Sequence, residues 1–372
     1  MRRREFISLL GGGAAVWPLA SSAQHRNRVS GGDQAMKVSG TSMLIGVTVL
    51  ALGVSLLSIS TSEAQRATSV SRVGWLEVCG QARRPYFDIF RRRLGELGYA
   101  EGKNLFIEQR FAECHYDRMP GLAIELAQMP VDVLFTMGTR ASRIVAETVK
   151  TTPIVVYSCD PFEHVTHLAR GRGNLTGVTC MTTELSPKRL ELFHEAVPTA
   201  SRVMFLHDPQ AAPNAWKLTQ EAAPGLGITL QQASVEGTEE LLPEFPMIAK
   251  EHPDALFVYP DVILSSHPRP QQLAEFALKA HLPMMNAFRF FADAGGLMTY
   301  GATASEIYTS AAEQVAKVLG GTRPSELPLR EATRFELVIN NWTAKALGLT
   351  IPPSLLARAD EVIESPPPIA TH

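Results

Sequence analysis

The chain has 372 residues, and its 35 lysines and arginines nearly balance its 37 aspartates and glutamates, for a formal net charge of -2. Because no basic block lies beyond the N-terminal segment, the composition excludes the electrostatic footprint of a nucleic-acid-binding protein. A domain usually takes about 100 to 200 residues, so the roughly 300 residues after the first 65 are enough for two lobes.

Two segments near the start have the layout of a cleavable secretory signal: a basic start, a short apolar run and small residues at the end. They cover residues 1–23 and 36–64 of an export signal region at residues 1–65. The first contains Arg3-Arg4-Glu5-Phe6-Ile7, which resembles the twin-arginine export signal, although an ordinary basic signal start also fits. Its apolar run is well short of the roughly 20 residues that span a bilayer.

The apolar run of the second segment, residues 43–59, approaches spanning length. It is therefore either a signal that is cut after Ala64 or a retained membrane tether, and its small-residue end favours cleavage. Two signals in one reading frame are redundant, so we expect either Met1 or Met36 to be the true start. The expected product is periplasmic.

From residue 73 onward, short apolar runs rich in β-forming residues alternate with amphipathic stretches, a pattern typical of parallel sheets with crossover helices. Strands are predicted at 73–77, 105–109, 131–136 and 154–158, and helices at 84–97, 119–128, 140–149 and 162–170. Gly98 stands where a glycine commonly ends a helix. These elements form the first lobe.

The same alternation restarts after the segment GRGNLTGVT and predicts a second α/β lobe. Its strands are predicted at 202–206, 229–233, 255–259 and 282–286, and its helices at 186–197, 212–226, 239–250 and 270–281. A strand at 297–300, a helix at 305–319, a strand at 335–340, two short helices around Pro352-Pro353 and a disordered tail at 365–372 complete the chain. The predicted class is α/β with two Rossmann-like lobes.

The four cysteines, Cys79, Cys114, Cys159 and Cys180, all lie in the part predicted to be exported, where an oxidising compartment permits disulfides. Four thiols allow three full pairings, and isolated buried thiols fit the sequence equally well. None of the spacings matches a zinc motif, so we expect no metal site.

Four long segments, in order, resemble the ABC-transporter substrate-binding protein family that includes tryptophan and phenylalanine importers. They are RRLGELGYAEGKNLFIEQRFAECHYDRMPGLAIELA, GNLTGVT followed by ELSPKRLELFHEAVP, AGGLMTYGATASEIY, and FELVINNWTAKALGLTIPPSLLARADEVI. The resemblance implies a type I periplasmic-binding fold, in which two Rossmann-like lobes with parallel sheets are joined by a three-strand hinge. It implies that residues 70–178 plus 302–332 form lobe one and 180–300 plus 333–364 form lobe two.

The resemblance also bears on the cysteines. The first and second strands are neighbours in such lobes, so Cys79 and Cys114 are expected to be close enough to form a disulfide. Small or polar residues are usual at these two positions in the family.

In an open α/β sheet, ligands bind beyond the carboxyl ends of the strands, where helix N-termini also point. This rule selects the segments 79–84, 137–139, 158–161, 207–210, 259–261 and 286–288. The candidate ligand-binding residues are Cys79, Gly138, Thr139, Ser158, Asp160, Asp208, Asp261, Phe288 and Tyr300.

These candidates suit the parts of an amino acid. Gly138 and Thr139 offer hydrogen-bond donors to a carboxylate, although Thr139 also suits a simple N-cap. The three aspartates can neutralise an ammonium group or merely stabilise turns. Phe288 and Tyr300 can stack against an apolar group or pack in the core.

A cysteine enzyme is the rival class, because Cys79, Cys114 and Cys159 accompany His115, His164 and His207. Nothing in their spacing indicates a thiol beside a base, and the GxSxG, HExxH and phosphate-loop motifs are absent from the sequence. We therefore expect a monomeric binding protein without a cofactor that passes a small polar solute, an amino acid or related organic acid, to an ABC permease and its ATPase. A module that feeds a sensor is the alternative.

Overall fold

The computed structural model describes residues 70–80, 84–159, 173–211, 213–235 and 244–367. The fold reported below belongs to the unit Ala64–His372. Asp160, both export-like segments, the helix predicted at 162–170 and most of the tail from residue 365 lie outside the described residues. No helix within the described ranges combines the length and apolarity needed to cross a bilayer.

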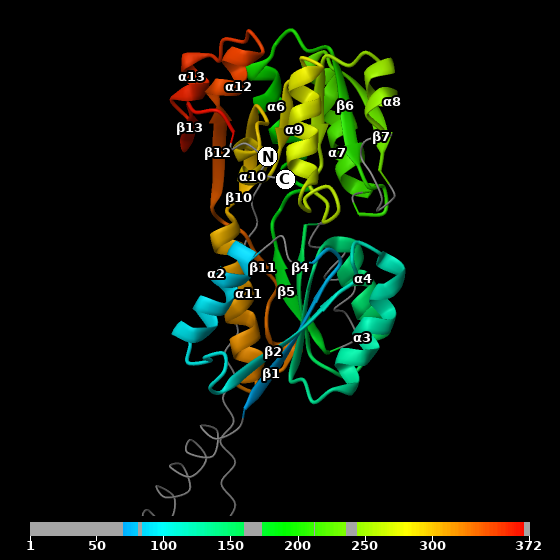
Figure 1. The fold of residues 1–372 in the computed structure, drawn as a ribbon, viewed down its shortest axis with the longest axis vertical. Coiled ribbons are helices and arrows are strands. Elements are labelled where there is room, and N and C mark those ends of the chain that lie inside the picture. The colour runs from blue at the N-terminus through cyan, green and yellow to red at the C-terminus, as the bar shows by residue number, and fades with distance from the viewer. Residues whose placement is uncertain (1–69, 81–83, 160–172, 212, 236–243, 368–372) are drawn as a thin grey trace, which may run out of the picture. The chain divides into compact units, whose positions relative to one another are not determined.

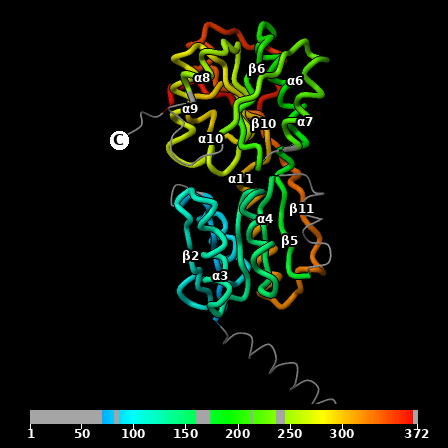
Figure 2. The backbone as a smooth tube through the Cα atoms, turned by 90° about the vertical axis from the view of Figure 1, so that its right-hand side faces the viewer, coloured from blue at the N-terminus to red at the C-terminus, as the bar shows by residue number. Residues whose placement is uncertain are grey.

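The first sheet is entirely parallel, with strand order β11-β5-β4-β3-β1-β2. Its strands are β1 (Ser71–Glu77), β2 (Leu105–Phe111), β3 (Val133–Met137), β4 (Ile154–Ser158), β5 (Leu175–Thr179) and β11 (Arg330–Glu331). Helices α2 (Arg84–Glu96) and α11 (Ala304–Leu319) pack together on one face, and α3 (Met119–Gln128) and α4 (Thr139–Thr148) cover the other, as Figures 1 and 2 show. With both faces covered, β3, β4 and β5 are buried along their whole length.

The second sheet has strand order β13-β12-β10-β9-β8-β6-β7 and is parallel except for the antiparallel pair β10 and β12. Its strands are β6 (Arg202–His207), β7 (Thr229–Ser234), β8 (Ala255–Val258), β9 (Met284–Asn286), β10 (Met298–Ala302), β12 (Phe335–Asn340) and β13 (Glu361–Ile363). Its helices are α6 (Ser186–Ala196), α7 (Pro213–Ala222), α8 (Glu244–Lys250), α9 (Arg269–Lys279), α10 (Arg289–Asp293), α12 (Asn341–Ala346) and α13 (Pro353–Leu356). The α/β class predicted from the alternating pattern is confirmed.

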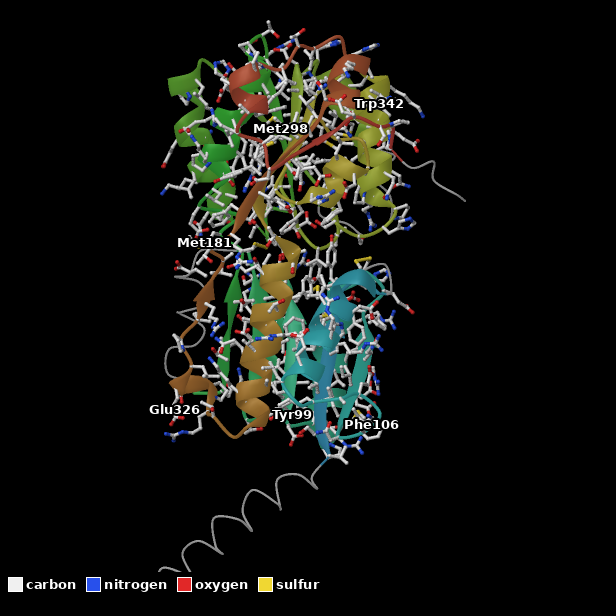
Figure 3. All side chains as sticks on the ribbon, turned by 90° about the vertical axis from the view of Figure 1, so that its left-hand side faces the viewer. Tyr99, Phe106, Met181, Met298, Glu326 and Trp342 are labelled. Carbon is white, nitrogen blue, oxygen red and sulfur yellow. A yellow bond between two sulfur atoms is a disulfide. The ribbon has the colours of Figure 1, made fainter. Side chains whose placement is uncertain are left out.

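We call each sheet with its helices a lobe. The chain passes between the lobes after β5, after β10 and after β11. Two of these crossings are tied together, because the amide of Thr303 donates to the carbonyl of Arg334 at 3.1 Å. The carboxylate of Glu306 accepts the amides of Thr333 and Arg334 at 2.9 and 2.7 Å. Figure 3 shows Met181, on the remaining crossing, between the two sheets.

An aromatic cluster holds α2 against the first sheet. The buried ring of Trp75 lies 5.0 Å from that of Phe87, 4.9 Å from that of Phe90 and 4.6 Å from that of Phe135, centroid to centroid. Aromatic pairs of this kind add about 0.5 to 1.5 kcal/mol to the free energy of unfolding beyond burial of their area. The helix ends near Gly98, whose φ of 93° favours glycine, as predicted.

Strand register brings the cysteines together. Parallel pairing of β4 with β5 places Ser158 opposite Thr179, so the next residues on the two strands, Cys159 and Cys180, stand side by side and form a disulfide. A second disulfide joins Cys79, after β1, to Cys114, after β2, which confirms the pairing expected from the resemblance. All four cysteines are therefore oxidised.

Candidate ligand-binding site

The pocket of interest lies between the lobes, at the carboxyl ends of the parallel strands, and has a volume of about 410 Å³ including space open to solvent. Lobe one contributes Tyr116, Met137, Gly138, Thr139, Tyr157 and Cys159. Lobe two contributes Ala211, Tyr259, Pro260, Asp261, Val262, Ser265 and Phe288. The strand-end rule predicted this position.

The wall from lobe one is built around the start of α4. Gly138 is the N-cap with a φ of 95°, a conformation that favours glycine, and its amide donates to the carbonyl of Tyr157 at 2.7 Å. The hydroxyls of Thr139 and the buried Ser158 lie 3.2 Å apart. Since the first amides of a helix lack intrahelical partners and carry partial positive charge, this wall suits an anionic group.

The wall from lobe two is built around Asp261, which is 5 % exposed. Its Oδ1 atom accepts the amides of Ile263 and Leu264 at 2.7 and 2.9 Å. Its Oδ2 atom is buried and has no hydrogen-bond partner within the described part of the chain, and the same is true of the Ser265 hydroxyl. An unpartnered carboxylate oxygen in a pocket wall is a strong site for a cation.

The pKa of the Asp261 carboxyl is raised toward neutral pH. Burial raises the pKa of its carboxyl to about 7, against the opposing effect of the Leu264 amide, and the nearby Asp208 carboxylate also raises it. A bound cation would lower this pKa because it stabilises the charged form.

Arg269 supports the loop that carries Asp261. Its guanidinium donates to the Ser266 hydroxyl at 2.7 Å and to the carbonyl of Ile263 at 3.4 Å. Burial lowers the pKa of Arg269, and Asp261 acts in the opposite direction. The Cys114 sulfur of lobe one lies 3.8 Å from the guanidinium, so this support reaches across the cleft.

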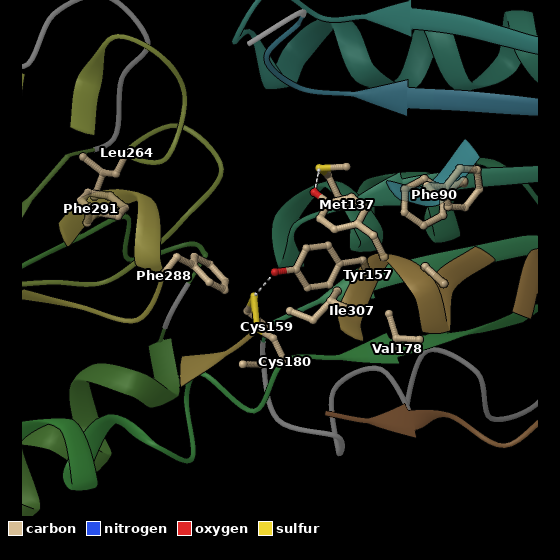
Figure 4. Packing of buried hydrophobic residues seen from close by; sticks show 14 of the residues in the cluster. Phe90, Met137, Tyr157, Cys159, Val178, Cys180, Leu264, Phe288, Phe291 and Ile307 are labelled. Atoms are coloured by element: carbon tan, nitrogen blue, oxygen red, sulfur yellow. Dashed lines mark hydrogen bonds between the residues drawn. A yellow bond between two sulfur atoms is a disulfide. The ribbon is translucent and has the colours of Figure 1, made fainter. Parts of the chain in front are cut away.

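Aromatic rings form the remaining side of the pocket. Tyr157 and Phe288 also border an adjoining hollow of about 230 Å³ including space open to solvent, whose other lining residues are Tyr86, Phe290, Ala304, Ile307 and Tyr308. The rings of Tyr86 and Tyr308 are stacked with centroids 5.3 Å apart. In Figure 4, Phe288 faces Tyr157 and Cys159 across the cleft. This lining is aromatic and apolar, the kind of surface that favours a flat or bulky apolar group.

The structure groups some of the predicted residues and separates others. Gly138, Thr139, Asp261 and Phe288 line the pocket. Ser158 lies behind Thr139, and Asp208 follows β6 and pairs with Arg140 of lobe one.

Three candidates do not join this group. Cys79 is held in its disulfide and is not in the lining. Tyr300 packs on β10 against the core on the α6 side and lies 6.3 Å from the Phe335 ring. Its side chain follows the pleat of the sheet and points to a face rather than to the edge where the pocket lies. Asp160 lies outside the described residues.

Sequence reasoning missed other lining residues: Tyr116, Tyr157, Ala211, Val262 and Ser265. Tyr157 is the penultimate residue of β4, so a slightly wider window at each strand end would have found it. Tyr116 begins a short 3-10 helix, Tyr116–Arg118, whose position no local pattern gives. In the described ranges, no three histidine, cysteine or acidic side chains gather as a metal site.

The family model for ABC transporter substrate binding proteins matches residues 78–363. The tyrosine-binding protein of Clostridioides difficile is 21 % identical over 316 residues, which cover 82 % of this chain and 90 % of that protein.

Two solved structures show the fold. A conserved domain protein from Vibrio cholerae superposes with a TM-score of 0.71 at 24 % identity, over 79 % of this chain and 100 % of that one. The ABC domain from Streptococcus pneumoniae in complex with L-Trp gives 0.69 at 20 % identity, over the same shares. The predicted type I periplasmic-binding fold is confirmed. With the family model matched across both lobes and the pocket between them, the chain belongs to the ABC transporter substrate-binding protein family.

Proposed function

We propose that the protein captures an α-amino acid with an aromatic or large apolar side chain in the periplasm and delivers it to an ABC permease and its ATPase. The observation that carries this proposal is Asp261, a lining residue of the pocket whose buried Oδ2 atom has no hydrogen-bond partner among the described residues. A ligand ammonium group is the cation that fits, since it can donate to this oxygen and balance its charge.

The other walls suit the rest of such a ligand. The carboxylate is placed at the N-terminus of α4, where Gly138 and the Thr139 hydroxyl line the pocket. The side chain extends between Tyr157 and Phe288 toward the adjoining aromatic hollow. The names of two relatives, one tyrosine-binding and one in complex with L-Trp, support this ligand class.

A cysteine enzyme needs a thiolate nucleophile, and the four cysteines of this chain do not supply one. All four sulfurs are engaged in disulfides, and a disulfide sulfur is not a thiolate. His207 stacks against Trp216 and contacts Gln232 at 2.7 Å, and burial lowers the pKa of the imidazole to about 4. We propose a binding protein rather than an enzyme, and a monomer that serves transport rather than a sensor.

A thermal-shift panel tests the proposal. L-phenylalanine, L-tyrosine, L-tryptophan, L-leucine and L-glutamate are compared with the N-acetyl and deaminated analogues of the aromatic ones. A ligand at 100 times its dissociation constant stabilises the folded protein by about 2.7 kcal/mol, so the free aromatic amino acids should raise the melting temperature and the amine-blocked analogues should not. Equal shifts with the deaminated acids would refute the role of Asp261, and a flat panel would refute the ligand class.

A further inference from the structure

One ion pair joins the lobes beside the pocket. Arg140, the second residue of α4 in lobe one, places Nη1 3.4 Å from Oδ2 of Asp208 in lobe two. The Asp208 side chain is 1 % exposed and that of Arg140 is 18 % exposed. The other oxygen of Asp208 accepts the amide of Gln210 at 2.8 Å, which fixes the carboxylate on its own lobe.

The position of Arg140 connects this pair to the ligand site. Its guanidinium lies over the ring of Tyr116, 4.1 Å from the centroid, and Tyr116 lines the pocket. Arg140 directly follows Thr139, which also lines the pocket. Arg140 therefore comes from a strand end that lines the pocket, and Asp208 lies three residues before Ala211, another lining residue.

An ion pair between two lobes exists only while the lobes are together. Shielded from water, such a pair is stronger than an exposed one, and opening the cleft breaks it. Arg140 also balances the charge of Asp208. The charge of Asp208 raises the pKa of Asp261. Because Arg140 pairs with Asp208, Asp261 is the carboxylate that remains available to a ligand.

We propose that Arg140 is a positioning residue whose pair with Asp208 latches the closed lobes and slows ligand release. This inference rests on the proposed function, because it assumes that the ligand binds between the lobes. The latch acts after the encounter, so it governs the dissociation rate more than the association rate.

The variants are Arg140→Gln, Asp208→Asn, the double variant and Arg140→Lys, which keeps the charge. Asn at position 208 retains an oxygen for the Gln210 amide. Arg358→Gln is the matched control, because Arg358 pairs with Glu195 at 2.8 Å within lobe two. Stopped-flow fluorescence with L-phenylalanine, L-tyrosine and L-tryptophan as probes gives the association and dissociation rate constants.

Each neutral single variant is expected to raise the dissociation rate about tenfold and to change the association rate by less than about twofold. The double variant should be no worse than the more affected single variant, because both remove one interaction. Arg140→Lys should keep most of the wild-type dissociation rate. Unchanged dissociation rates, or effects of the two single changes that simply add, would overturn the latch.

A pH readout separates the latch from a purely structural role. The charged groups that act on Asp261 are Asp208 and Arg269, with Arg140 acting through Asp208. Removing the charge of Arg140 exposes Asp261 to an unbalanced Asp208, so Arg140→Gln should move the midpoint of the affinity-against-pH curve upward. A midpoint identical to that of the wild type would count against the proposal.

Small-angle X-ray scattering of the ligand-free protein measures lobe closure without any added ligand. Arg140→Gln and Asp208→Asn should be more open than the wild type and Arg358→Gln. If no probe binds but these variants open, the proposed ligand class fails, while the part of the inference that the pair holds the lobes closed stands. If the probes bind but scattering and dissociation rates are unchanged, the latch fails and the proposed function stands.

Discussion

Gly138 of lobe one and Val262 of lobe two face each other across the pocket so closely that a Cβ atom on Gly138 would lie 2.3 Å from Cγ2 of Val262. Gly138 also has a φ of 95°, which side-chain-bearing residues rarely adopt. A glycine is therefore required here both by the backbone and by the approach of the opposite lobe.

Gly138→Ala should hold the lobes apart and weaken ligand affinity, by about tenfold or more if closure is blocked. Gly98→Ala is the matched control for backbone strain, because Gly98 has a φ of 93° and no atom within 4 Å of an added Cβ. It should lower stability without changing the dissociation constant in calorimetric titrations.

Removing the opposing methyl groups tests the cause of that loss. Val262→Ala in the Gly138→Ala background deletes the atom that the new Cβ meets and should recover part of the affinity. If the double variant binds no better than Gly138→Ala, steric blocking of closure is not the explanation.

Asp261 should make the folded protein less stable as the pH rises. Its folded-state pKa of about 7 exceeds the ordinary value of 3.8, so between these pH values the native state keeps a proton that the unfolded state releases. The stabilisation is complete below pH 3.8 and is lost as the pH rises through 7. Asp261→Asn should therefore raise the melting temperature at pH 8 more than at pH 5. A larger gain at pH 5 would contradict the burial of this charge.

Ligand binding should be linked to proton release. An ammonium group favours the ionised form of Asp261, so affinity should weaken as the pH falls below about 7. Calorimetry at pH 6.5 in two buffers of different ionisation enthalpy counts the protons released, and the count should disappear in Asp261→Asn. Identical enthalpies for the wild type in the two buffers would exclude this linkage.

The two disulfides should contribute similarly to stability but differently to ligand binding. Each closes a loop of comparable length, and converting either pair to serines should lower the free energy of unfolding by about 3 kcal/mol. Cys159 lines the pocket, and its carbonyl accepts the Tyr259 hydroxyl of lobe two at 3.3 Å. The Cys159→Ser/Cys180→Ser variant should therefore weaken ligand binding more than Cys79→Ser/Cys114→Ser. Equal affinities in the two variants would argue against a role in the pocket wall.

Local patterns predicted the long elements well. The predicted bounds of β4 and β12 equal the observed Ile154–Ser158 and Phe335–Asn340, because each is an apolar β-forming run between clear breaks. The segments α10, β11 and β13 were missed. They have two to five residues each, too few to show a period, and they exist through contacts with distant strands.

The site was predictable to the extent that strand ends determine it. Gly138 directly follows β3 and Asp261 is the third residue after β8, so the sheet largely places them. Ser265 and Tyr116 lie farther along their loops, and their positions depend on tertiary packing. The pairing of Arg140 with Asp208 depends on the approach of the two lobes, which no pattern in either segment encodes.

The central claim is that Asp261 receives the ammonium group of an amino acid between the lobes. Calorimetric titration of the wild type and Asp261→Asn with the best aromatic amino acid of the panel tests it most directly, with Asp117→Asn, an exposed carboxylate beside the pocket residue Tyr116, as the control. We predict that Asp261→Asn loses about 2 to 5 kcal/mol of binding free energy while Asp117→Asn binds like the wild type. Undiminished binding by Asp261→Asn would contradict the account.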